Sequence, residues 1–519
     1  MDRHGHIHRW VGSASKALCL GWAIALVAFS LGCGSVEERV DADGSIETDV
    51  DGALPDDASP GEQDATPISP DAAFSCEPGS FLSCEGDDSA VVCNEDGTDT
   101  DVVGCDGSGC SEASAGCNAC TPNEVSCRGD DLTTCGEDGT VSEVVTCPLG
   151  CDDSGAEGQC LVLEPSNLDA ETCETLATNN DPIDDDIDTD EDCDYVVDQS
   201  EGPSICVIDR DELLVPAGAE IKVTGSRALA LVGTSTVTID GGIDASASRQ
   251  TPGPGAPTEA GTGGDGQDED DSRPDFGGGG AGHGTDGAPG SATVDEGGGG
   301  QGGSEFGLDR IQPLRGGAKG GLTGGGGGSE CRGQPGAGGG AVQVVSCGEF
   351  RLGTDGSLHV GGGGGQGGMR FDDFTGLCAA EGGGGGGSGG AVLIESAAAE
   401  VLGTVAANGG GGGGGGATNS NDPIGSSGSD GDLTTEPAAG GPGGGAGGAG
   451  GAGGAVAAEP AVGEPGEEVT SGNETRKAGA GGGGGAVGRI RINVRRDTDP
   501  QISDALLSPE PSIGAVETR

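Results

Sequence analysis

Aromatic residues are scarce in this sequence. Phe, Tyr and Trp account for 2% of the 519 residues, and both tryptophans lie within the first 22 positions. Large aromatic side chains contribute much of the buried area in ordinary globular cores. Any core must therefore be thin and built from Val, Ile, Leu and Ala. Beyond the N-terminal segment, the chain also has no Trp on which a sugar ring could stack.

Cationic residues are scarce as well. The chain has 23 Lys and Arg against 87 Asp and Glu, which gives a net charge of −64. Nucleic acids and anionic membrane surfaces are themselves polyanions, so this balance disfavours both as partners. It is compatible with a solvated acidic surface and with loose binding of divalent cations.

Signatures of catalysis are also missing. The sequence contains neither the HExxH motif of zinc proteases nor the GxxxxGK[ST] loop of nucleotide-binding proteins. We interpret His283 and His359 as surface or loop residues. A polysaccharide-active site would need acidic and basic groups gathered on one face, and only scattered cations are available for it. These are Arg310, Arg315, Lys319, Arg351 and Arg370. We therefore predict a protein that is not an enzyme and has no cofactor.

The N-terminus has the features of an export signal. Cationic residues precede an apolar stretch, 17–32, that is too short for a comfortable membrane span. It ends in FSLGC, which resembles the lipobox of bacterial lipoproteins, although Ser30 stands where that family usually has Leu. The resemblance implies that 1–32 is a lipoprotein signal peptide and that Cys33 is the lipidated residue. Gly34, next to it, favours the outer membrane by the same resemblance. The alternatives to lipidation are ordinary signal cleavage and a cysteine that stands there by coincidence.

Residues 33–75 are predicted to form a disordered acidic tether. Asp, Glu, Pro, Ser and Ala dominate this stretch, and aliphatic periodicity is almost absent. Such a composition cannot bury enough apolar surface to fold, and its charge extends it. A tether of this kind would hold folded parts clear of a bilayer.

Residues 76–160 contain a duplicated cysteine pattern. Two copies, 76–117 and 120–160, each carry six cysteines, and an EDGT turn follows the third cysteine of each. The twelve cysteines are Cys76, Cys84, Cys93, Cys105, Cys110, Cys117, Cys120, Cys127, Cys135, Cys147, Cys151 and Cys160. In an exported chain this spacing predicts three disulfides per copy, with fifteen pairings open in each.

Zinc binding is the competing interpretation of these cysteines. Only one CxxC pair occurs, Cys117–Cys120, and it lies at the junction of the two copies. In cysteine density the copies resemble EGF-like and other small extracellular modules, without matching the EGF spacing. The resemblance implies a spacer or binding role. The second copy also contains the tripeptide Arg128-Gly129-Asp130, which arises often by chance.

The segment 161–206 is rich in aspartate and contains three further cysteines. Its sequence DPIDDDIDTDEDCD places carboxylates at alternate positions, a spacing that suits hard cations. An EF-hand loop beginning at Asp186 would need Gly at its sixth position and Glu at its twelfth, where Glu191 and Val197 stand. A weak Ca²⁺ site and a solvated acidic linker both remain open, and we expect the linker.

Residues 207–496 combine β-patterned segments with long glycine runs. In 228–247, and again from 341, 391 and 486, apolar residues alternate with small or polar ones, as in strands with one buried face. Recurring pairs of short strands with small residues at the corners predict a parallel β-helix. We expect the fold to be mainly β, and 497–519 to be a C-terminal tail.

The glycine runs are expected to be insertions at one corner of this solenoid. They cover roughly 248–340, 361–390 and 409–485, and they lack the strict Gly-X-Y period of collagen. Three interpretations remain open: flexible loops, laterally bundled polyglycine-II helices, or tracts that become ordered only on binding.

The glycine-rich composition resembles that of PE-PGRS proteins, most clearly in GGAGGAGGAGGAV (Gly444–Val456). The resemblance covers about 250–490, and no PE-type N-terminal domain is present. It implies a surface-exposed, non-catalytic protein. We therefore expect a lipid-anchored outer-membrane protein with a structural or adhesive role toward a matrix, a polysaccharide or another protein. A Ca²⁺- or ligand-binding module on a β-helix scaffold is the alternative, followed by a polysaccharide-active enzyme.

Overall fold

The computed structural model describes residues 74–519 except 107, 176, 257–260, 268–275, 293–297, 325–331, 370–379, 420 and 472. The expected signal peptide, Cys33 and nearly all of the acidic tether lie outside the described residues. The described chain is built from strands and extended segments and contains no helix, which confirms the mainly β class. It follows that no helix in this part of the chain is available to cross a bilayer.

The two cysteine-rich copies fold into two similar small units. Each unit has a three-stranded antiparallel sheet followed by a pair of two-residue strands. The first contains β1 (Phe81–Cys84), β2 (Ser89–Cys93), β3 (Thr100–Gly104), β4 (Cys110–Ser111) and β5 (Gly116–Cys117). The second contains β6 (Val125–Arg128), β7 (Asp131–Cys135), β8 (Val141–Thr146), β9 (Cys151–Asp152) and β10 (Gln159–Cys160). The repeated EDGT turns place Gly97 and Gly139 at positive φ, which explains the glycine there.

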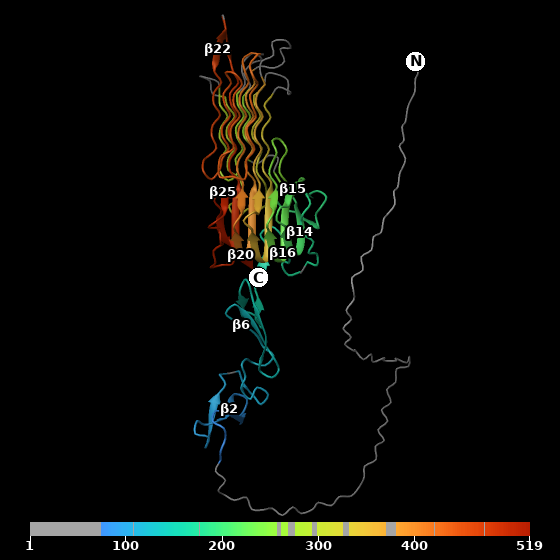
Figure 1. Cartoon of the computed structure of the whole chain (residues 1–519), viewed down its shortest axis with the longest axis vertical. Helices are drawn as coiled ribbons and strands as arrows, with labels where there is room; N and C mark the ends of the chain where they lie inside the picture. Colours follow the sequence, from blue (N-terminus) through green and yellow to red (C-terminus); the bar gives the residue numbers. More distant parts are fainter. Residues whose placement is uncertain are drawn as a thin grey trace, which may run out of the picture. The chain divides into compact units, whose positions relative to one another are not determined.

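Thirteen of the remaining strands form two largely parallel sheets (Figure 1). The long sheet has seven strands: β13 (Tyr195–Val197), β14 (Ile205–Val215), β16 (Ala228–Ile239), β18 (Ala341–Leu352), β20 (Ala391–Val401), β24 (Arg489–Val494) and β26 (Ser512–Ala515). The short sheet has six: β12 (Ile187–Asp188), β15 (Glu220–Thr224), β17 (Gly242–Asp244), β19 (Ser357–His359), β21 (Thr404–Ala406) and β25 (Leu506–Ser508). All neighbours are parallel except β13 and β14. From β14 to β26 the chain alternates between the two sheets.

The core consists of stacked aliphatic side chains. In the long sheet, parallel pairing aligns like residues from strand to strand, as in the row Ile208, Leu231, Val344, Ile394 and Ile492. The short sheet has a corresponding row, Ile221, Ile243, Leu358, Val405 and Leu507. Members of both rows belong to one buried cluster. A core without Tyr or Trp is therefore achieved by repetition of small contacts.

The first half of each long strand is buried on both faces, not on one as we expected. In β16, residues Ala228 to Thr234 are all buried, and alternation begins only afterwards. The second face carries Ala230, Val345 and Leu393, which pack against Leu163 and Leu314. The sequence ALALV is apolar at every position for this reason.

The segments at both ends of the sheets are part of the fold. We expected a solvated linker over 161–206 and a tail over 497–519. Instead β11 (Leu163–Glu164) pairs with β27 (Glu517–Thr518), and β25 and β26 extend the two sheets. Ile183 and Ile187 enter the main core. The two isoleucines are four residues apart, and the three aspartates between them made this buried pair hard to recognise in the sequence.

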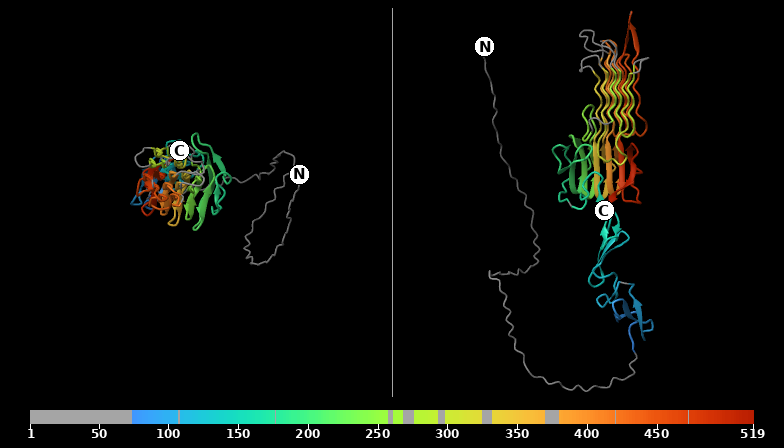
Figure 2. Two further views of the ribbon diagram at one scale, coloured as in Figure 1. Left: turned by 90° about the horizontal axis from the view of Figure 1, so that it is seen from above. Right: turned by 180° about the vertical axis from the view of Figure 1, so that it is seen from behind.

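The glycine-rich insertions are ordered wherever the structure describes them. They run alongside one another beyond the ends of the strands (Figures 1 and 2). Their described residues are mostly neither helix nor strand, apart from the antiparallel hairpin of β22 (Glu468–Ser471) and β23 (Glu474–Lys477) in the third insertion. Along the straight parts of the segments, hydrogen bonds join each segment to its neighbours, whereas bonds between residues close in the sequence, such as Gly447 N–H to Gly444 O, lie at turns. Of the three interpretations left open by the sequence, the structure supports lateral bundling.

The central glycine segment, 380–390, shows the rule of this bundle. The N–H groups of Gly383, Gly384 and Gly385 bond to three different segments, through Ala480 O, Gln366 O and Gly321 O. Gly386, Gly387 and Ser388 then repeat the same rotation. The carbonyls of 383–388 accept bonds from three other segments, 276–284, 407–418 and 332–340. This period of three residues is that of a polyglycine-II helix. The three segments that accept its bonds and the three that donate to it make six segments around 380–390.

Close packing explains why glycine fills the central segment. A Cβ at Gly385 would lie 1.9 Å from Gly279 O, and one at Gly387 would lie 1.9 Å from Ala337 O. Both obstacles are backbone atoms that cannot move without breaking the lateral bonds. Glycine is therefore required there by the neighbours, and not by a special backbone angle.

Gly386→Ala tests the bundle directly. The new Cβ would lie 2.0 Å from Gly410 O. We expect the free energy of unfolding in urea to fall by about 3 kcal/mol, because an overpacked backbone contact must separate two segments. Gly104→Ala is the control, since nothing lies within 4 Å of a Cβ there. Equal stability of the two variants would mean that the segments do not pack in solution.

Candidate functional site

All twelve cysteines of the repeated pattern form disulfides in the structure, and both copies share one connectivity. In each copy the first cysteine bonds to the third, the second to the fifth and the fourth to the sixth. The bonds are Cys76–Cys93, Cys84–Cys110, Cys105–Cys117, Cys120–Cys135, Cys127–Cys151 and Cys147–Cys160. The structure thus selects one of the fifteen pairings that the cysteine spacing left open in each copy.

Two more disulfides hold the acidic segment to the long sheet. Cys173 bonds to Cys347 in β18, across a sequence separation of 174. Cys193 bonds to Cys206 in β14, across a separation of 13. Neither pair is predictable from the repeat, because no second copy of these cysteines exists.

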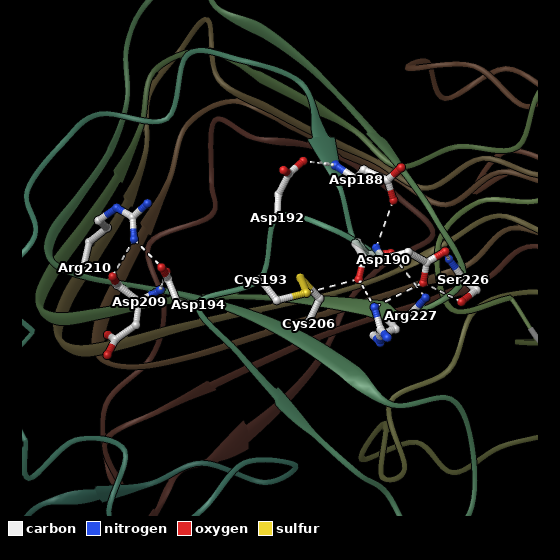
Figure 3. Close-up of a disulfide and its surroundings, with 11 residues drawn as sticks. Asp188, Asp190, Asp192, Cys193, Asp194, Cys206, Asp209, Arg210, Ser226 and Arg227 are labelled. Atoms are coloured by element: carbon white, nitrogen blue, oxygen red, sulfur yellow. Dashed lines mark hydrogen bonds and ion pairs between the residues drawn. A yellow bond between two sulfur atoms is a disulfide. The ribbon is translucent and has the colours of Figure 1, made fainter.

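The Cys193–Cys206 bond closes the aspartate-rich loop that we considered for calcium. Figure 3 shows its carboxylates turned toward protein donors. Asp190 accepts bonds from the N–H and hydroxyl of Ser226 and pairs with Arg227 at 3.3 Å. Asp194 pairs with Arg210 at 2.7 Å. These two carboxylates are directed at different partners and do not converge on a common point.

The remaining carboxylates of the loop form its turn. Asp192 Oδ2 accepts the N–H of Asp188, and Asp188 Oδ1 accepts the N–H of Asp190. Such bonds are typical of aspartate in turns. Within the described ranges, no group of three or more Asp, Glu, His or Cys residues is arranged to hold a metal ion. The alternate spacing of the aspartates thus serves the loop's own backbone.

Asp209 is the one carboxylate here with a strongly shifted pKa. It lies in β14, and its Oδ1 is buried without a hydrogen-bond partner. Burial, together with the negative charge of Asp194, raises the pKa of Asp209 to about 6, against the opposing effect of Arg210. Its ionised form is therefore unfavourable in the folded protein.

The Arg-Gly-Asp tripeptide lies in the turn between β6 and β7. Gly129 adopts a positive φ, and Arg128 donates to Ala119 O. Asp130 forms a two-point ion pair with Arg495, 2.9 Å from Nη1, and hydrogen bonding from that guanidinium lowers its pKa. The aspartate is engaged within the chain, where it joins the second cysteine-rich unit to the end of β24.

His359 links a glycine segment to the short sheet. Its Nδ1 lies 3.3 Å from Asp244 Oδ1, and its Nε2 lies 2.9 Å from Gly431 O. Burial alone would raise the pKa of Asp244, but hydrogen bonds from His359, Ser246 and Lys222 hold it well below the usual range. Both ring nitrogens are occupied, so neither is available to act on a substrate.

His283 is a core residue, contrary to our expectation of a surface position. It is buried and stacks on Phe306 with ring centroids 4.6 Å apart. Its Nδ1 lies 2.8 Å from Gly389 O, and burial lowers its pKa to about 4. The imidazole of His283 is therefore neutral, and its Nδ1–H donates to the carbonyl. The buried ring fills space among the glycine segments, which have no side chains of their own.

The cations considered for catalysis do not gather. Arg351 pairs with Asp240 and Glu400 on the long sheet, while Arg315 and Lys319 lie in the first glycine insertion. Arg370 is outside the described residues. Arg310 alone lines a pocket, as described below.

A Gly-x-Ser-x-Gly pattern at 386–390 also has a structural role. Ser388 is fully buried, and its Oγ accepts the N–H of Ala318. The nucleophile elbow with this pattern requires an exposed serine between a strand and a helix. Ser388 lies in an extended glycine segment that leads into β20.

A buried polar network lies on the second face of the long sheet. The carboxylate of Glu395 in β20 is fully buried and accepts four hydrogen bonds. Ser166 donates both its hydroxyl, at 2.6 Å, and its N–H, at 3.1 Å. Gln343 donates at 2.7 Å and Asn493 at 3.2 Å. A buried carboxylate is tolerated only when its oxygens are satisfied in this way.

This network forms the floor of a polar pocket of about 370 Å³. The pocket is lined by Ser166 and Asn493 and by charged residues from separate segments: Glu164, Arg310, Arg491 and Glu517. The sequence analysis missed it, because no two of these segments are neighbours in the chain. The one available signal was Glu395, a charged residue inside the apolar strand AVLIESAAAEV.

Removing the long-range disulfide should destabilise the protein strongly. A cross-link across 174 residues restricts the unfolded chain more than one across 13. We expect Cys173→Ala with Cys347→Ala to lower the free energy of unfolding by about 5 kcal/mol, against about 3 kcal/mol for Cys193→Ala with Cys206→Ala. Urea unfolding of both double variants measures the difference, and a larger loss from the short loop would contradict this ranking.

Asp209→Asn should stabilise the protein in a pH-dependent manner. A carboxyl whose folded pKa is raised favours folding when protonated, and this contribution is lost as the pH rises through about 6. Above that pH the variant should gain about 1 kcal/mol, because solvent screens a half-buried charge, and near the ordinary pKa it should gain nothing. Thermal unfolding across this pH range tests it, with Asp184→Asn, at an exposed position, as the control.

Comparison with known proteins gives no further guide to this site, since no protein-family model, no curated protein and no solved structure matches the chain.

Proposed function

We propose that the protein is a non-catalytic, lipid-anchored cell-surface protein whose glycine-rich arm has a structural or adhesive role. The observation that carries the proposal is the order of the glycine insertions. Each described central segment is bonded laterally to several others, so the arm is a rigid bundle and not a set of loose loops. A rigid extension on a fixed base suits the presentation of a surface to a matrix, a polysaccharide or another protein.

The base of the arm is proposed to be a parallel β-helix. The alternation of the chain between two parallel sheets supports this architecture, as does the stacking of like residues from coil to coil. In a solenoid each coil can carry an insertion at the same corner. The three glycine insertions all leave after a short-sheet strand and return before a long-sheet strand.

The disulfides bear on where the protein resides. Eight disulfides among the described residues indicate an exported protein, because such bonds persist in oxidising compartments. Lipid attachment at Cys33 and an outer-membrane position are part of the proposal, supported by the lipobox-like sequence alone.

Protease treatment of intact cells, combined with Cys33→Ser, tests both parts of the proposal. Wild-type protein should fractionate with membranes and be cleaved from outside, while the variant should appear in soluble fractions. Cys19→Ser, in the same apolar stretch, should behave as wild type. Full protection of the wild-type protein in intact cells would exclude surface display, and a membrane-bound Cys33→Ser variant would exclude lipid attachment there.

A further inference from the structure

The polar pocket contains two guanidinium groups without an acidic partner. Arg491 lies on β24 and Arg310 in the first glycine insertion. Several other arginines of the described chain pair with carboxylates, as Arg351 does with Asp240 and Arg495 with Asp130. Two arginines without such a pair in one pocket are available to an acidic group of a ligand.

The same pocket contains two carboxylates without a cationic partner. Glu164 and Glu517 are directly opposite each other in the β11–β27 pair. Like charges in this position repel each other, so the arrangement costs stability unless a cation lies between them. All four residues line one pocket, yet neither glutamate lies within 4 Å of the guanidinium of Arg310 or Arg491. In the described part of the chain, neither glutamate forms an ion pair with any other residue.

The floor of the pocket is rigid and leaves polar atoms unsatisfied. Asn493 is 4% exposed and is fixed through its Nδ2 to the fully buried Glu395. Its Oδ1 is buried and has no hydrogen-bond partner, and the same holds for Arg491 Nε. Both atoms have almost no accessible surface, so a ligand in the pocket would meet the charged groups of its lining and not these two atoms.

We propose that this pocket binds a small zwitterion, such as a free α-amino acid with a small or polar side chain. Its carboxylate would lie between Arg310 and Arg491, and its ammonium group would face Glu164 and Glu517. The two opposite charges of a zwitterion would pair with the arginines and with the glutamates of the pocket, whereas a simple anion would pair only with the arginines. The volume of about 370 Å³ is within the range of small-molecule sites.

This binding does not depend on lipid attachment or on surface display, so it can be tested on purified protein. Titration calorimetry would compare L-serine, L-glycerate and ethanolamine. L-glycerate replaces the ammonium group by a hydroxyl with the same configuration, and ethanolamine lacks the carboxylate. We expect L-serine to bind at millimolar concentration or below, and the other two to bind at least about tenfold more weakly.

Two variants locate the site. Arg310→Gln removes an exposed guanidinium that makes no ion pair, so it should leave the fold intact while weakening L-serine binding by about tenfold. Arg491→Gln should weaken it at least as much. Arg496→Gln removes the same charge from an exposed position outside this pocket and should have no effect.

Each contrary result has a definite meaning. Equal binding of L-serine and L-glycerate would replace the zwitterion by a hydroxy acid and overturn the proposal. The absence of binding by all three probes would overturn it as well. Serine binding that survives both Arg310→Gln and Arg491→Gln would place the site elsewhere.

Discussion

The glycine-rich arm is held together by hydrogen bonds from the backbone N–H groups of each glycine segment to carbonyls of other segments. A polyglycine-II helix has no internal hydrogen bonds, so an isolated segment gains nothing from being ordered. Glycine also loses more conformational freedom on folding than any other residue. Order is therefore collective, and 380–390 is stable only because six neighbours are already in place.

The parallel sheets provide those neighbours. Strands β18, β20 and β24 are adjacent in the long sheet, and the glycine segments that lead into them are hydrogen-bonded to one another in the same order. Neighbouring strands lie about 4.8 Å apart, and this spacing positions the glycine segments where they begin. The aliphatic rows of the core and the disulfide to Cys347 thus stabilise the arm indirectly, because they hold its starting points in register.

Much of the fold was predictable from local pattern, whereas the pocket was not. The alternation in 228–247 identified β16 and β17, and the duplicated cysteines identified two disulfide units, because both signals repeat within short stretches. The aspartates of 184–194 led us to expect a solvated linker, because their charges obscured Ile183 and Ile187, which are buried in the main core. The bond of His283 to Gly389 and that of Glu395 to Ser166 join residues more than 100 positions apart, which no local pattern encodes.

The threefold rotation of hydrogen bonds restricts how such an arm can change its length. One residue added within 383–388 would turn every later N–H by a third of a circle, toward a neighbour that already has its donor. Only an addition of three residues preserves the directions, and the returning segment must gain three as well if the strands are to stay in register. An insertion or deletion in the gene would thus be tolerated here in blocks of nine nucleotides and in matched pairs, a stricter rule than the reading frame itself imposes.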